Sequence, residues 1–110
     1  MAFVLKKQDS YFWPVILKSP KDGGGFEEQS IELQFKRLKA GDLKKLVEQK
    51  KDDTLICAEI IVGWKNVSNE KGDSIPFSET NLFEVLDCVG FSSQIVSQYL
   101  ESISGAITKN

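Results

Sequence analysis

Apolar and polar residues alternate most clearly near the start of this chain of 110 residues. Three apolar residues there are separated by charged or amide side chains: Ile31, Leu33 and Phe35. A period of two is typical of a strand with one buried face. Aromatic and β-branched residues indicate an earlier strand at residues 12–18, and the glycine-rich stretch 19–25 provides a turn. We therefore predict an antiparallel β-hairpin of residues 12–18 and 27–37. Because Pro14 lacks an N–H, the first strand is expected to lie at a sheet edge or to start irregularly.

Four helices are expected after the hairpin, because apolar residues recur there at spacings of three and four. They span about residues 40–50, 53–64, 79–89 and 93–104. Asp52 and Asp53 are suited to begin the second helix, and Ser78 the third. The segment Glu59–Val62 alone would also suit a strand, but the length of the apolar run favours a helix.

The last predicted helix is amphipathic. Ser92 is its expected N-cap, and Gly105 its expected end. Gly90 is expected to end the helix before it. The apolar side of the last helix, which we expect to be buried, comprises Ile95, Val96, Tyr99, Leu100 and Ile103. No internal repeat or change of composition divides the chain, so we expect a single α+β domain of residues 1–110.

Composition disfavours several classes of function. The net charge is −2 and the chain has no histidine, which removes the commonest general base and metal ligand. Cys57 and Cys88 are too few for a structural zinc site. They would pair only if the fold brought them together, and two reduced core thiols are the preferred interpretation. Gly23–Gly25 opens a strand rather than a helix, so it is not a phosphate-binding loop.

No catalytic residue, cofactor or metal site is therefore predicted, and the acidic residues fall where capping and solubility place them. The basic residues Lys44, Lys45, Lys50 and Lys51 have acidic neighbours, which favours a solvated helix face over a nucleic-acid site. No apolar run is long enough for a membrane helix or a signal peptide.

Three aromatic residues are the candidates for contact with a partner. Trp64 and Phe77 flank a polar loop from both sides. The favoured interpretation is that both pack into the core and fix the ends of the loop. The alternative is that one of them belongs to an exposed patch for a partner. Trp13 competes for that role at the strand edge, where an extended partner segment would also add on.

Short motifs follow one another along almost the whole chain. They are Tyr11–Val15, Phe35–Leu38, Ile61–Val67, Asn69–Gly72, Ile75–Ser78 leading into Asn81, and Tyr99 in the last helix. In this order the motifs resemble the tail assembly chaperones of tailed bacteriophages and prophages. The order Val-Gly-Trp, Gly and Pro-Phe-Ser is the most specific part of the resemblance. These motifs describe a fold, so they assign no functional residue.

The resemblance implies a non-enzymatic protein of the host bacterial cytoplasm. Such a chaperone binds the tape measure protein and keeps it soluble until the tail tube polymerises, and it is absent from the mature virion. Tail tube subunits would be further partners, whereas nucleic acid and membranes would not. Formation of homo-oligomers is left open. The alternative is a minor structural subunit of the tail or head–tail joint that is retained in the virion.

Overall fold

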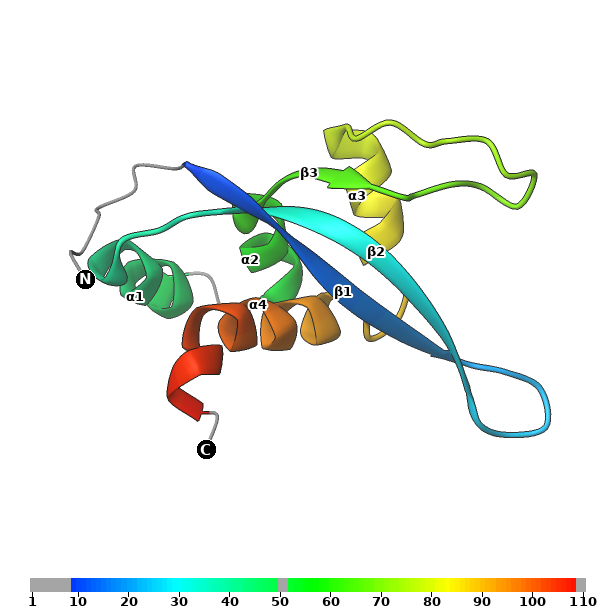
Figure 1. Cartoon of the computed structure of the whole chain (residues 1–110), viewed down its shortest axis with the longest axis horizontal. Coiled ribbons are helices and arrows are strands. Elements are labelled where there is room, and N and C mark those ends of the chain that lie inside the picture. The colour runs from blue at the N-terminus through cyan, green and yellow to red at the C-terminus, as the bar shows by residue number, and fades with distance from the viewer. Residues whose placement is uncertain (1–8, 50–51, 109–110) are drawn as a thin grey trace, which may run out of the picture.

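The computed structural model describes residues 9–49 and 52–108, which form a three-stranded antiparallel sheet and four helices (Figure 1). The elements are β1 (Ser10–Pro20), β2 (Phe26–Lys36), α1 (Ala40–Gln49), α2 (Asp53–Ile60), β3 (Ile61–Lys65), α3 (Glu79–Leu86) and α4 (Phe91–Thr108). The strand order is β1-β2-β3, and α2 and α4 pack on one face of the sheet. The predicted α+β class is confirmed.

The predicted hairpin is confirmed. β1 and β2 pair over all 11 residues of each strand, so β1 extends further at both ends than the sequence indicated. The turn between them contains Gly23, Gly24 and Gly25, whose φ angles lie between 83° and 96°. Residues with a Cβ rarely adopt such angles, so the three glycines allow the chain to reverse. β1 lies at the sheet edge, as Pro14 predicted.

The helix predicted for residues 53–64 is wrong in its second half. α2 ends at Ile60, and the next five residues form β3, which pairs with β2. β3 contains one extra residue, Val62, relative to its partner strand. This bulge turns both Ile61 and Trp64 towards the core-facing side of the sheet. The β-branched run at the start of β3 thus pairs with β2, which is distant in sequence. The helical spacing of apolar residues within the run does not reveal this pairing.

Side-chain caps begin α2 and α3 where the sequence predicted them. The Thr54 N–H donates to Asp52 Oδ1 at 2.8 Å, and the Asn81 N–H donates to Ser78 Oγ at 3.1 Å. α3 then ends earlier than predicted, and Gly90, with a φ of 86°, lies in the turn that leads to α4.

α4 is longer than predicted at both ends. Ser92 is not its N-cap but lies inside the first turn, buried, where its hydroxyl is 2.9 Å from Thr54 Oγ1. The helix also continues past Gly105, which was expected to end it. Packing of its first turn against α2 provides a partner for Ser92 that local sequence does not show.

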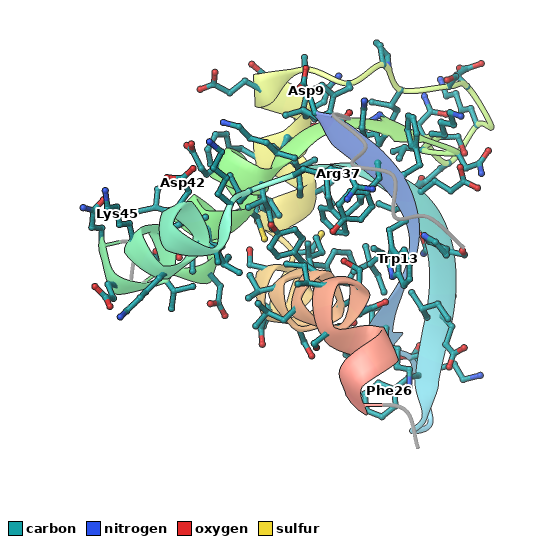
Figure 2. The ribbon with its side chains drawn as sticks, turned by 60° about the vertical axis from the view of Figure 1, so that its left-hand side comes forward. Asp9, Trp13, Phe26, Arg37, Asp42 and Lys45 are labelled. Atoms are coloured by element: carbon teal, nitrogen blue, oxygen red, sulfur yellow. The ribbon has the colours of Figure 1, made fainter. Side chains whose placement is uncertain are left out.

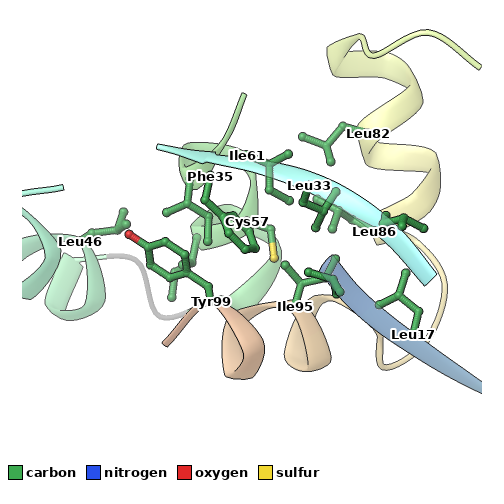
Figure 3. Packing of buried hydrophobic residues seen from close by; sticks show 14 residues of the cluster. Leu17, Leu33, Phe35, Leu46, Cys57, Ile61, Leu82, Leu86, Ile95 and Tyr99 are labelled. Atoms are coloured by element: carbon green, nitrogen blue, oxygen red, sulfur yellow. The ribbon is translucent and has the colours of Figure 1, made fainter. Parts of the chain in front are cut away.

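The core lies between the sheet and the helices α2 and α4 (Figure 3). The rings of Phe35 and Tyr99 meet edge to face at its centre, with 5.0 Å between their centroids. The buried apolar residues are Val15, Leu17, Ile31, Leu33, Phe35, Leu46, Ile56, Cys57, Ile60, Ile61, Leu82, Leu86, Ile95 and Tyr99. Three residues of the predicted apolar side of α4 are not among them. Val96 is only partly buried against the cluster, Leu100 is 41% exposed and Ile103 is 49% exposed. Within the described ranges, no helix is both long and apolar enough to span a membrane.

Candidate functional site

Trp64 and Phe77 stabilise the loop that follows β3. Their rings meet edge to face with 5.2 Å between centroids, and the indole N–H of Trp64 donates to the Ile75 carbonyl at 2.8 Å. Both side chains are half-buried against the core. Asn69 Oδ1 accepts hydrogen bonds from two backbone N–H groups within the same loop. This geometry supports the interpretation that the two aromatic residues fix the ends of the loop.

Trp13 has a different environment. Its side chain is 36% exposed and lies on the wall of a groove of about 530 Å³. We call this hollow the Trp13 groove, and its lining residues are Tyr11, Trp13, Arg37, Leu38, Ala40, Leu43, Tyr99, Ser102 and Ile103. They come from β1, from the connection between β2 and α1, and from α1 and α4. Figure 2 shows Trp13 and Arg37 in the space that these elements border.

The polar groups of the Trp13 groove already have partners. Tyr11 Oη lies 2.7 Å from Ser102 Oγ, and the Arg37 guanidinium lies 4.9 Å from the centroid of the Tyr11 ring. Burial, followed by the influence of Tyr11, raises the pKa of Tyr99 to about 12, so this phenol stays protonated at neutral pH. Because these groups are satisfied, the groove presents a shaped, largely apolar surface.

The three candidate aromatic residues do not form one site. In the sheet, Trp13 and Trp64 both lie opposite Leu33, one on each side of it. Their rings nevertheless serve different surfaces, since Trp64 packs with Phe77 and Trp13 lines the groove. Phe77 also borders a smaller hollow of about 420 Å³ between β3 and α3, together with Val62.

The described residues, those of the Trp13 groove included, contain no group of three His, Cys, Asp or Glu side chains that could hold a metal ion. Cys57 is buried, and its Sγ donates to the Ser92 carbonyl at 3.5 Å. Burial, with a smaller effect of Asp53, raises the pKa of this thiol to about 12. Cys88 is also a free thiol, but it is exposed, so its predicted place in the core is wrong.

Two glutamines of α4 occupy the outer edge of β1. The Ile16 N–H donates to Gln98 Oε1 at 2.9 Å, and the Gln98 Nε2 donates back to the Ile16 carbonyl at 2.7 Å. Gln94 makes the same two contacts with Lys18, at 2.8 Å and 3.0 Å. We call Gln94 and Gln98 the glutamine pair. Their amides make the hydrogen bonds that a neighbouring strand would make.

Prolines complete the closure of this edge. Alternate residues of an antiparallel strand direct their backbone polar groups to the same side, so Pro14 and Pro20 face the same edge as Ile16 and Lys18. Neither proline has an N–H to donate. Between these two prolines, no N–H at the outer edge is left for another strand. An extended segment therefore cannot pair with β1 between Pro14 and Pro20, and pairing beside Trp13 would be confined to the stretch of β1 before Pro14.

Comparisons of the chain with protein-family models, curated proteins and solved structures find no match.

Sequence reasoning identified Trp13 but not the rest of its groove. Leu43 and Ile103 have the spacing of core residues, and nothing local distinguishes an apolar side that is covered from one that is left open. A signal for the glutamine pair was present, because two amides four residues apart lie on one side of α4. Their partners are 76 and 82 residues away in sequence.

Proposed function

We propose that this protein is a tail assembly chaperone of a tailed bacteriophage or prophage. It binds the tape measure protein and keeps it soluble until tail tube subunits polymerise around it. The order of motifs along the chain supports this proposal, and the observation that carries it is the Trp13 groove. An open groove with aromatic walls offers a partner a place to bury apolar side chains.

The physical task explains why such a groove would be needed. A tape measure protein exposes long apolar helical surface before the tube encloses it, and such surface promotes aggregation. A protein that lays part of this surface in its own groove removes it from water, as other helix-in-groove complexes do. The binding requires no covalent chemistry, in keeping with a non-enzymatic role in the host cytoplasm.

Co-expression with the tape measure protein of the same phage tests the proposal. We expect more tape measure protein in the soluble fraction when this chain is present, and a complex that co-purifies. Trp13→Ala and Ile103→Gln, which alter two walls of the groove, should reduce both effects by about tenfold or more, since central aromatic contacts carry much of an interface's energy.

The matched control is Phe26→Ala. Phe26 is 65% exposed at the tip of the hairpin and does not line the Trp13 groove. This variant should behave as the wild type. Equal solubility of the tape measure protein with and without this chain, and no complex, would refute the proposal. Retention in purified virions, measured by mass spectrometry, would instead indicate a structural subunit of the tail.

A further inference from the structure

Charge is unevenly distributed along this chain, although its net charge is only −2. Residues 36–51 contain seven of the fourteen basic residues and two acidic ones. Residues 72–108 contain no lysine or arginine, and five acidic residues. The basic residues of the first segment are Lys36, Arg37, Lys39, Lys44, Lys45, Lys50 and Lys51.

This distribution makes the two long walls of the Trp13 groove different. One wall is α1 with the connection before it, and the other is α4, whose one charged residue is Glu101. A second hollow of about 540 Å³ shares Arg37 and Leu38 with the groove and is also lined by Lys39 and Lys45. Lys44 follows Ala40 of the groove by one helical turn.

The lysines of this wall are available to a partner. Lys39, Lys44 and Lys45 are exposed. The ion pairs Lys18–Glu28 and Lys36–Glu59 do not include them. Asp42 and Glu59 border the same second hollow as Lys39 and Lys45, but basic residues outnumber them there. An acidic side chain of a bound segment would therefore meet a wall with a positive net charge.

The shape of the site favours a helix over a strand as its occupant. The glutamine pair closes the outer edge of β1 between Pro14 and Pro20, so an extended segment that started beside Trp13 could not continue its backbone pairing along the strand. The groove instead lies between two helices, where a third helix can place side chains against both walls.

We propose that the Trp13 groove binds an amphipathic helix with an acidic flank. The apolar stripe of this helix packs on Trp13, Leu43 and Ile103, and its acidic flank faces α1. The inference rests on the proposed function only in assigning such a helix to the tape measure protein. It also fixes the orientation of the helix about its own axis, because only one wall of the groove is basic.

Two designed helical peptides test this inference with the purified full-length chain. They share one leucine stripe, and one carries glutamates along a flank where the other carries lysines. Calorimetry should give a dissociation constant about tenfold lower for the glutamate peptide at low salt, a preference that weakens as salt is added. Trp13→Ala should weaken the binding of both peptides.

Charge reversal provides the matched pair of variants. Lys39→Glu with Lys44→Glu should invert the preference between the two peptides. Lys21→Glu with Lys71→Glu makes the same change of net charge outside the groove and should leave the preference intact. Equal or tighter binding of the lysine peptide to the wild type would overturn the inference. Displacement of the glutamate peptide by a short polyuridylate, lost in the Lys39 and Lys44 variant, would also overturn it and assign the basic wall to nucleic acid.

The two proposals fail in different ways. If the peptides show no charge preference while the tape measure protein still co-purifies, the acidic flank is wrong and the chaperone role stands. If the glutamate peptide binds as expected but no tape measure complex forms, the chemistry of the groove stands and the proposed function is wrong.

Discussion

Trp64 and Trp13 lie on either side of Leu33 in the sheet, yet their surroundings give them separate roles. Trp64 has a ring partner and a hydrogen bond to the Ile75 carbonyl, so its removal disturbs the loop and the core beneath it. Trp13 leaves a third of its surface to solvent in a groove. A substitution at Trp64 should therefore change stability, and one at Trp13 should change binding.

Trp64→Ala should lower the free energy of unfolding by about 2–4 kcal/mol, because a half-buried indole, an edge-to-face contact and a hydrogen bond are lost together. Trp64→Phe keeps a ring beside Phe77 and should lose only about 1–2 kcal/mol. Urea unfolding followed by circular dichroism measures both values. A loss below about 1 kcal/mol for Trp64→Ala, with partner binding abolished, would make Trp64 a contact residue instead.

Cys57 should make stability depend on alkaline pH. Its pKa rises from 9.0 to about 12 on folding, chiefly through burial, so the folded protein holds the proton more tightly than the unfolded chain. The contribution is complete below about pH 9 and is lost as the pH rises towards 12. The stability difference between the wild type and Cys57→Ala should thus shrink by about 1.4 kcal/mol per pH unit above pH 9.

Urea unfolding at a series of pH values measures this difference. Cys88→Ala is the control, because that thiol lies at the surface. A difference between the wild type and Cys57→Ala that stays constant from pH 8 to pH 11 would contradict the assignment.

At the level of elements, α4 both covers the core and closes the sheet. Ile95 and Tyr99 are buried under the strands, while the glutamine pair reaches the edge of β1. The edge of a sheet is a template for pairing with other chains unless it is blocked. The four amide contacts therefore block pairing of this part of the edge with another chain and also hold α4 in place.

Replacing Gln94 and Gln98 by alanine should promote self-association, because Ile16 and Lys18 regain free backbone groups. Light scattering should show that the average molar mass of this variant increases with protein concentration more steeply than that of the wild type. Ser93→Ala with Ser97→Ala alters the same helix without touching the edge and serves as the control.

A rescue variant tests the route of association. Lys18→Pro, added to the two alanine substitutions, removes an N–H from the exposed edge in the manner of Pro14 and Pro20. It should restore the mass distribution of the wild type. Association that persists in this variant would show that the new contacts do not run through β1.

The elements that sequence predicted well are those whose causes are local. The alternation at Ile31, Leu33 and Phe35 gives β2, and the side chains of Asp52 and Ser78 begin α2 and α3. Long-range contacts decided what was missed. β3 forms because the edge of β2 that does not pair with β1 is available for pairing. The apolar run that becomes β3 cannot indicate this by itself.

The same limit applies to the candidate site. Trp13 was identified as an exposed aromatic candidate at a strand edge. Ile103 was expected in the core, because an amphipathic helix shows which of its sides is apolar but not what covers that side. In this fold the sheet and α2 cover the half of α4 that holds Ile95, and the far half is left open at the groove.

Over the whole molecule, stability is expected to be uneven. β2, α2 and α4 share the central cluster, whereas Leu46 is the one residue of α1 that is buried. Hydrogen exchange should therefore be slowest in β2 and α2 and considerably faster in α1, which has little apolar surface holding it in place. Mass spectrometry of exchanged peptides measures this order, and equal protection in α1 and α2 would contradict it.

The loose attachment of α1 has a further implication for the Trp13 groove. If α1 opens more readily than the rest, the groove can widen to admit a helix without disturbing the central cluster. Binding should then slow hydrogen exchange in α1 more than in any other element, which gives a second readout for the peptide experiments.

The closed edge of β1 also bears on how fast a partner leaves. A segment that joined the sheet would be released only after a row of backbone hydrogen bonds had broken together. A helix bound at the groove through its side chains can dissociate by breaking one contact at a time. Its residence time is therefore set by a few apolar and charged contacts. A competitor that buries more surface can displace such a partner. By excluding strand pairing between Pro14 and Pro20, the glutamine pair and its flanking prolines thus help to set the dissociation rate of the partner and not only its affinity.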